Sequence, residues 1–206
     1  MDIQKNYKKS LTQIIEKDIL AIEELATKLE KPTPIVYFSG DAHCIEERLH
    51  PPIKEAFIHL IRNALDHGLE SKEIRLAQKK PQCGLITIDE KIESGVIQII
   101  FFDDGVGLDL QVVAHKALEN RLVLEEELAK MSAIEIASFI FSPNFSTKKE
   151  ASEISGRGIG LDRIASIMQE YSRQIYIESQ VEQKMAKKGN LAIQFVIKLP
   201  IFPPKY

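Results

Sequence analysis

Residues 85–107 read LITIDEKIESGVIQIIFFDDGVG, and this stretch decides which fold class the sequence favours. Two runs rich in β-branched and aromatic residues, at 85–88 and 96–102, predict strands. The intervening Glu93-Ser94-Gly95 predicts a turn, so the two strands are expected to form a hairpin. Strands joined in this way are the first indication of how the rest of the chain is arranged.

Further strands and several helices are predicted on both sides of this hairpin. Strand-like runs occur at 35–38, 174–179 and 191–199. Helical spacing of apolar residues occurs at 4–29, 53–67, 71–80, 111–119, 125–130, 132–141 and 161–171. Helices beside hairpin-linked strands favour an α+β fold over a doubly wound parallel sheet. We therefore expect a two-layer α/β sandwich, with a mixed, mostly antiparallel sheet covered by helices.

The first helix is expected to be one amphipathic segment of about seven turns. It ends at Lys31-Pro32-Thr33-Pro34. The sequence leaves two interpretations open: a helix packed on its own domain, or the end of a connector or dimerisation helix. We divide the chain into this helix (1–31), a main domain (32–202) and a C-terminal tail (203–206).

The composition excludes several classes of partner. The chain has 206 residues and a formal net charge of -3, which gives no electrostatic argument for a nucleic-acid or anionic-membrane partner. No apolar run approaches the ~20 residues of a membrane helix, so membrane insertion is not expected. The two cysteines, Cys44 and Cys83, lack the spacing of metal ligands. A reduced, cytoplasmic protein is therefore expected.

A polar face accompanies the apolar stripe of the helix predicted at 53–67. His59, Asn63, Asp66 and His67 stand at i, i+4, i+7 and i+8, which would place them on one side of an α-helix. An asparagine amide oxygen suits Mg²⁺, whose other ligands are mainly waters and substrate phosphates. His59 could accept a proton or bond a terminal phosphate. A solvated helix face has the same spacing, so the spacing alone does not decide.

The strand predicted at 96–102 ends in Asp103, Gly105 and Gly107. A carboxylate at a strand end can accept a hydrogen bond from an exocyclic amine such as N6 of adenine. Glycines directly after it let the backbone approach a flat base, although Asp-Gly is also routine in β-turns. The motif is not a dinucleotide fingerprint, because Leu110 occupies the position of the third glycine.

Three alternating glycines, Gly156, Gly158 and Gly160, precede the helix that begins near Leu161. Such a segment can direct consecutive backbone N–H groups at an anion. Upstream, Phe145-Ser146-Thr147-Lys148 leads into a polar stretch without periodicity. A mobile lid that carries a lysine would close over phosphates from this position, and a plain surface loop is the alternative.

The order of these motifs resembles the GHKL superfamily of ATP-binding domains. Within it, the chain resembles the ATP-binding catalytic domain of CheA-type chemotaxis histidine kinases, from about residue 31 to residue 200. The motifs that carry this closer resemblance are His59-x-x-Arg62-Asn63-x-x-Asp66-His67-Gly68, Phe145-Ser146-Thr147 and Ser155-Gly156-Arg157-Gly158. The resemblance implies the Bergerat fold, ATP and Mg²⁺ as cofactors, and transfer of the γ-phosphoryl group to a histidine on a separate phosphotransfer domain.

The resemblance also implies a role for each motif residue. His59 would act as a base or γ-phosphate contact, with Arg62 and Lys148 assisting catalysis. Asn63 and His67 would lie at the metal. Asp103 would read the adenine amine, with Gly107 behind the base. The remaining nucleotide contacts would come from Asp66, Gly105, Phe145, Ser146, Thr147, Gly156, Arg157, Gly158, Ile159, Gly160 and Leu161.

The chain departs from the family pattern near its last strand, where Ala192-Ile193 replaces a Gly-Thr pair. The second hypothesis is therefore a catalytically impaired nucleotide-binding module that scaffolds a partner. A conformational ATPase of the same superfamily is the third, disfavoured because His59 replaces the glutamate that activates water there. The resemblance further implies dimerisation and adaptor-binding domains, or receptor and adaptor proteins, as partners of this domain.

Overall fold

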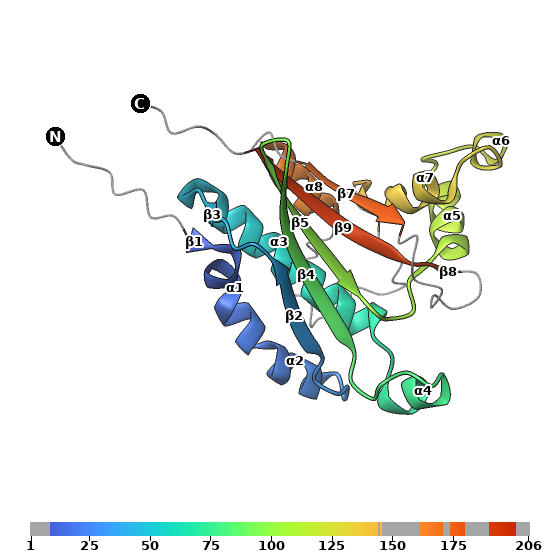
Figure 1. Ribbon diagram of the computed structural model, residues 1–206. Coiled ribbons are helices and arrows are strands. Elements are labelled where there is room, and N and C mark those ends of the chain that lie inside the picture. Colours follow the sequence, from blue (N-terminus) through green and yellow to red (C-terminus); the bar gives the residue numbers. More distant parts are fainter. Residues whose placement is uncertain (1–8, 144, 146–160, 171–173, 180–189, 201–206) are drawn as a thin grey trace.

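A five-stranded sheet forms the main layer of the molecule (Figure 1). The computed structural model describes residues 9–143, 145, 161–170, 174–179 and 190–200. The strand order is β2-β4-β5-β9-β7, with a parallel β2–β4 pair and antiparallel pairs elsewhere. The strands are β2 (Ile35–Gly40), β4 (Leu85–Glu93), β5 (Val96–Asp103), β9 (Ile193–Pro200) and β7 (Gln174–Ser179). The predicted mixed, mostly antiparallel sheet is confirmed.

The hairpin predicted from residues 85–107 is formed by β4 and β5. Its register pairs Ile86 with Asp103 at one end and Glu93 with Val96 at the other. The two turn residues, Ser94 and Gly95, have φ of 51° and 76°, as a tight two-residue hairpin turn requires. This hairpin places Asp103 at the last position of its strand.

Helices cover one face of the sheet, where Figure 1 shows α1, α3 and α8. The helices are α1 (Leu11–Leu20), α2 (Ile22–Lys28), α3 (His50–Asn63), α4 (Lys72–Ala77), α5 (Leu110–Glu119), α6 (Glu125–Leu128), α7 (Ala133–Ser138) and α8 (Leu161–Glu170). Two short strand pairs accompany them: β1 (Lys9–Ser10) with β3 (Cys44–Ile45), and β6 (Leu108–Asp109) with β8 (Asn190–Leu191). No helix in the described ranges is long and apolar enough to cross a membrane.

Aromatic packing joins α3 to the centre of the sheet. The ring of Phe57 on α3 meets Phe101 on β5 edge to face at 6.1 Å, and Phe101 meets Phe195 on β9 at 6.4 Å. All three rings are buried. Edge-to-face pairs of this kind add to the free energy gained from burial of the rings. The packing holds α3 against β5.

The N-terminal helix differs from the prediction of one continuous helix over 4–29. Residues 4–8 lie outside the described ranges, and α1 begins at Leu11 because Ser10 and Gln13 form a reciprocal capping box. A short interruption at Ala21 separates α1 from α2, although Leu25 N still donates to Ala21 O. The buried residues Ile15 and Ala26 show that both helices pack inward, while the choice between a helix of its own domain and a connector or dimerisation helix stays a prediction. The division of the chain at residue 31 stays a prediction.

Two other helices also end differently from the prediction. The helix predicted at 71–80 stops at Ala77, because Lys79 adopts a positive φ of 60° and the chain turns back. The helix predicted at 53–67 begins earlier, at His50, and becomes a π-helical turn over Ala64–Gly68. Both changes lie next to the candidate site.

Candidate functional site

The C-terminal end of the α3 segment meets the loop that follows β5. Val106 N donates to Gly68 O at 2.9 Å. A Cβ atom at Gly68 would lie 2.6 Å from Asp103 Oδ1, and one at Gly105 would lie 2.1 Å from Gly68 O. Only glycine allows such close approach at both positions. The structure therefore brings together the first two motifs found in the sequence.

Asp103 is half-buried at this junction. Its Oδ1 accepts a hydrogen bond from Gly105 N at 3.0 Å, while Oδ2 accepts none from the residues that the structure describes. Burial raises the pKa of Asp103 to about 6, and the charges of Asp104 and Glu70 act in the same direction. The Gly105 N–H and the Lys80 ammonium lower it. At neutral pH the carboxylate is mainly ionised and has one oxygen available to a donor.

Gly107 lies against the segment that leads into β9. It has φ of +74°, and a Cβ atom there would lie 2.7 Å from Leu191 O. Asn190 Nδ2 donates to Val106 O at 3.0 Å. The β8 segment therefore still closes against the loop, although Ala192-Ile193 replaces the family's Gly-Thr pair directly after it.

His59 and Asn63 lie one turn apart on α3, about 6 Å along the helix axis. Both side chains are half-buried. Burial lowers the pKa of His59 below its ordinary value, Arg62 lowers it further, and Glu55 opposes them. The imidazole is therefore neutral at pH 7 and able to accept a proton.

Asp66 and His67 lie within the π-helical turn, which is closed by Leu69 N donating to Ala64 O at 2.7 Å. The prediction that they share a face with His59 and Asn63 assumed a regular α-helix. A π turn has more residues per turn, so Asp66 and His67 do not keep the i+7 and i+8 positions of an α-helix. The expected alignment holds for His59 and Asn63, whereas a face shared with Asp66 and His67 stays a prediction.

Lys31 holds the carbonyl groups at the end of this turn. Its Nζ donates to Leu65 O at 2.5 Å, Leu69 O at 2.8 Å and Asp66 O at 3.2 Å. Carbonyls at a helix end have no partner within the helix, and a cation satisfies them well. Burial lowers the pKa of Lys31, while the charges of Asp66 and Glu70 oppose the shift. The segment after α2 is thereby tied to the turn that carries Asp66 and His67.

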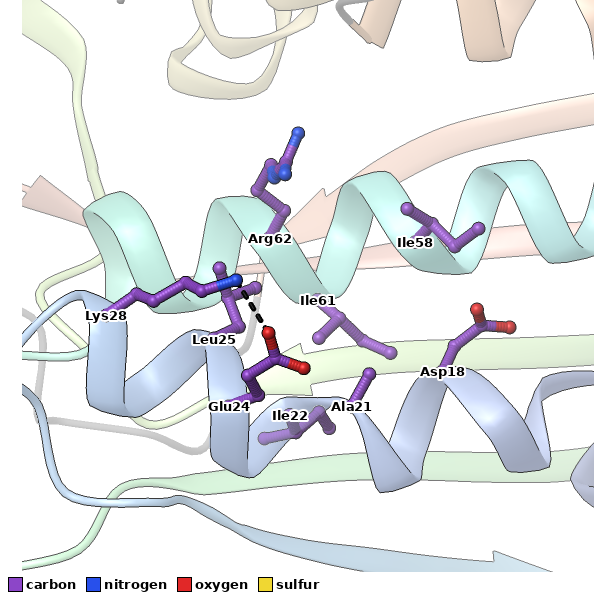
Figure 2. A pocket seen from close by; sticks show the side chains of 9 residues that line it. All are labelled: Asp18, Ala21, Ile22, Glu24, Leu25, Lys28, Ile58, Ile61 and Arg62. Atoms are coloured by element: carbon purple, nitrogen blue, oxygen red, sulfur yellow. Dashed lines mark hydrogen bonds and ion pairs between the residues drawn. The ribbon is translucent and has the colours of Figure 1, made fainter. Parts of the chain in front are cut away.

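Arg62 lies at the edge of a groove between α3 and the first two helices. Figure 2 shows the Arg62 side chain extending from α3 away from α2. On α2, Lys28 pairs with Glu24 at 2.6 Å. The groove is lined by Asp18, Ala21, Ile22, Glu24, Leu25, Lys28, Ile58, Ile61 and Arg62. Arg62 is half-buried, and its role at the phosphates stays a prediction.

The predicted lid and glycine-rich segment are mostly outside the described ranges. Phe145 is described and is 8% exposed, within the hydrophobic core. Leu161 begins α8 and packs against the same core. The other residues of these motifs lie outside the described part: Ser146, Thr147, Lys148, Gly156, Arg157, Gly158, Ile159 and Gly160. Their proposed contacts with a nucleotide stay predictions.

The sequence interpretation missed a buried ion network beneath the loop after β5. Lys80 Nζ donates to Glu70 Oε1 at 2.7 Å, and Arg75 Nη1 donates to Glu70 Oε2 at 3.0 Å. Arg75 Nη2 also donates to Asp104 Oδ2 at 2.6 Å. Arg75 is completely buried, and Glu70 and Lys80 are each 7% exposed. Their segment resembles an ordinary charged helix, so no local pattern in the sequence indicated the network.

A preformed cluster of metal ligands is not required for the predicted Mg²⁺. Among the described residues, no three His, Cys, Asp or Glu side chains gather as possible ligands. A Mg²⁺ ion that keeps its waters and binds substrate phosphates needs only one or two protein oxygens. The amide of Asn63, half-buried on α3, fits that requirement. His67 is exposed and remains a weaker candidate.

Comparison with known proteins now identifies the family. A family model described as histidine kinase-, DNA gyrase B-, and HSP90-like ATPase matches residues 50–201, the segment that contains α3, β5 and the site between them. The chain belongs to this ATPase family. The family assignment confirms the resemblance to ATP-binding domains inferred from the motifs.

The relatives that this chain matches include chemotaxis proteins. Chemotaxis protein CheA of Borreliella burgdorferi is 30% identical over 191 residues, which cover 93% of this chain and 21% of that protein. CheA of Bacillus subtilis is 31% identical over 180 residues, 87% of this chain and 25% of that protein. The chain therefore spans about a fifth to a quarter of the CheA relatives that it matches.

Solved structures with the same fold are histidine kinase catalytic domains. The catalytic domain of the histidine kinase ThkA superposes with a TM-score of 0.58 at 16% identity, covering 98% of this chain and 100% of that one. The mycobacterial sensor histidine kinase MprB gives 0.57 at 12% identity, covering 94% and 97%. These similarities confirm the predicted two-layer fold.

Proposed function

We propose that this domain binds Mg-ATP and transfers the γ-phosphoryl group to a histidine on a separate phosphotransfer domain. The observation that carries the proposal is the junction of Gly68 with Asp103 in a chain of this ATPase family. There, a carboxylate with one oxygen held by its own loop leaves the other oxygen for a ligand donor.

Asp103 would recognise the adenine ring. An exocyclic N6 amine can donate to Oδ2, which the loop leaves available. Gly105 and Gly107 would support the base indirectly, because their missing side chains let the loop close on Gly68 O and Leu191 O beside Asp103. Hydrogen bonds to an ionised acceptor are stronger than those between neutral groups, so this one contact would contribute strongly to affinity.

The residues of α3 would serve the phosphate end of the nucleotide. Asn63 would ligate Mg²⁺, and the ion would neutralise charge on the phosphates during transfer. His59, which burial keeps neutral, would accept a proton or bond the γ-phosphate. Arg62 and, from the lid, Lys148 would offset the remaining negative charge. Catalysis would then depend on positioning and charge more than on covalent chemistry.

The acceptor histidine and the regulatory partners would lie elsewhere in a longer protein or complex. The chain matches only 21% of the length of one CheA relative and 25% of another. That share is consistent with a catalytic domain working beside phosphotransfer, dimerisation and adaptor-binding domains. These partners are proposed from the family alone.

A labelling experiment separates the kinase from the alternatives. With radiolabelled ATP and a supplied phosphotransfer domain, we expect His59→Gln to keep ATP binding and lose labelling of the acceptor. His115→Gln is a matched control, because His115 is exposed on α5 and pairs with Glu119 at the surface. Equal labelling by the wild type and His59→Gln would exclude His59 from the chemistry. Nucleotide binding without any labelling by the wild type would favour the impaired module.

A further inference from the structure

We propose that Lys80 is a positioning residue for the adenine end of this site, and that its contacts with backbone carbonyls determine the preference for adenine over a 6-oxopurine. The inference rests on the proposed function and deepens it. Lys80 does not need to touch the nucleotide for this role. It acts through the loop that carries Asp103.

Lys80 holds two consecutive carbonyl groups of that loop. Its Nζ donates to Asp104 O at 2.8 Å and to Gly105 O at 3.2 Å. A third contact, to Glu70 Oε1 at 2.7 Å, fixes the ammonium from the other side. With the side chain 5% exposed, these hydrogen bonds form where water competes little.

One peptide group connects Lys80 with Asp103. The carbonyl of Asp104 and the N–H of Gly105 belong to the same planar trans peptide, so they point in opposite directions and rotate together. Lys80 binds that carbonyl at 2.8 Å, and the N–H donates to Asp103 Oδ1 at 3.0 Å. Fixing the carbonyl therefore fixes the donor that orients the carboxylate. The orientation of the carboxylate in turn decides where Oδ2 faces.

The ion network prevents Lys80 from leaving this position. Glu70 bonds both Lys80 and the fully buried Arg75, and Arg75 also bonds Pro81 O at 2.7 Å and Asp104 Oδ2 at 2.6 Å. A buried charge is costly unless it is paired, so each of these groups keeps its partners. The loop is thus held both at its carbonyls, by Lys80, and at the Asp104 side chain, by Arg75.

Removal of Lys80 should affect recognition of the base amine selectively. Without the ammonium, the peptide between Asp104 and Gly105 can rotate, and Asp103 loses its fixed donor. A nucleotide with an exocyclic amine, such as ADP, loses a hydrogen bond. Inosine diphosphate has a 6-oxo group in place of the amine, so it makes no such bond and loses little.

The test is calorimetric titration of ADP and inosine diphosphate, each with Mg²⁺, into the wild type and Lys80→Met. We expect ADP affinity to fall about tenfold, the effect of one net hydrogen bond, while inosine diphosphate affinity changes less than about twofold. Lys116→Met is the matched control, because Lys116 pairs with Glu119 on α5 and lies outside the buried ion network. An equal fall for both nucleotides, or no change for either, would overturn the inference.

A second pair of variants covers the case in which Lys80→Met does not fold. Glu70→Gln/Lys80→Met removes the buried carboxylate and the buried ammonium together, so it leaves less uncompensated charge in the interior than Lys80→Met does. Glu70→Gln alone keeps the lysine donors on the Asp104 and Gly105 carbonyls. We expect the single variant to keep the preference for ADP and the double variant to lose it. If the double variant prefers ADP as strongly as Glu70→Gln does, the inference about Lys80 is overturned but the proposed function is not. If the wild type binds neither diphosphate, the proposed function is overturned as well.

Discussion

Two lysines hold the two segments that meet at the candidate site, and they do so in different surroundings. Lys31 binds three carbonyls at the end of the π-helical turn, and burial lowers its pKa. Lys80 binds two carbonyls of the loop after β5 and also pairs with Glu70 in a buried ion network. Within the described part of the chain, the hydrogen bonds of Lys31 go to neutral carbonyl groups, whereas Lys80 belongs to a set of mutually dependent charges.

The difference teaches where the site is rigid and where it is adjustable. The loop that carries Asp103 is fixed by several paired charges, so the adenine end is preorganised. The turn that carries Asp66 and His67 accepts three hydrogen bonds from Lys31, in the segment after α2, besides the bond from Val106 N to Gly68 O. Because that segment follows α1 and α2, a shift of the N-terminal helices would reach the phosphate end before it reaches the adenine end.

The largest expected effect is the loss of Arg75, at the centre of the ion network. Arg75→Met should lower the free energy of unfolding by about 3–5 kcal/mol, because Glu70 and Asp104 lose a buried partner. Urea denaturation followed by circular dichroism measures this change. Arg48→Met, which removes a surface pair with Glu46, should cost less than about 1 kcal/mol. An equal loss of unfolding free energy in Arg75→Met and Arg48→Met would show that the buried network does not stabilise the loop.

A smaller effect on stability is expected at Lys31. Lys31→Met should lower the free energy of unfolding by about 1–2 kcal/mol, because Lys31 is itself half-buried and water can take its place at the carbonyls of Leu65 and Leu69. Lys28→Met is the control, since Lys28 pairs with Glu24 on the surface. A cost for Lys31→Met as large as that for Arg75→Met would contradict the contrast between the two ends of the site.

A third effect is a pH dependence at Asp103, with opposite signs for folding and binding. Because its pKa is raised from 3.8 to about 6, the folded protein binds more protons than the unfolded chain between these values. The free energy of unfolding of the nucleotide-free protein should therefore decrease as pH rises from about 4 to 6, relative to Asp103→Asn. ADP binding should instead weaken as pH falls through about 6, because the protonated carboxyl loses its acceptor. A stability difference between wild type and Asp103→Asn that stays constant over this range would contradict the burial argument.

The same contrast explains what the sequence could predict. The β4–β5 hairpin and α3 follow from local patterns: alternation of apolar residues, a turn with Gly95, and helical spacing before Asn63. The glycines at 68, 105 and 107 stand within or beside the motifs. Each lies at a position where another part of the backbone or a side chain comes too close for a Cβ atom. The hairpin and the helix were predicted because each depends mainly on neighbouring residues, whereas the close approach of Gly68 to Asp103 joins distant segments and was not predicted.

The parts that the sequence did not reveal depend on residues far apart in the chain. Lys31 contacts the carbonyl of Leu65, 34 positions away, and Lys80 contacts that of Asp104, 24 positions away. A charged segment such as 70–80 has the composition of a solvent-exposed helix, although Arg75 is completely buried. The π-helical turn likewise follows from tertiary contacts at its end, and no residue type specifies it.

The most direct test of the account is titration calorimetry of Mg-ADP with the wild type and Asp103→Ala. We predict that the wild type binds ADP, that omission of Mg²⁺ weakens binding, and that Asp103→Ala lowers the affinity about 10- to 100-fold, as expected for loss of a hydrogen bond to a charged group. Binding of equal affinity by both proteins, or no binding heat with the wild type, would contradict the central claim that Asp103 reads the adenine ring.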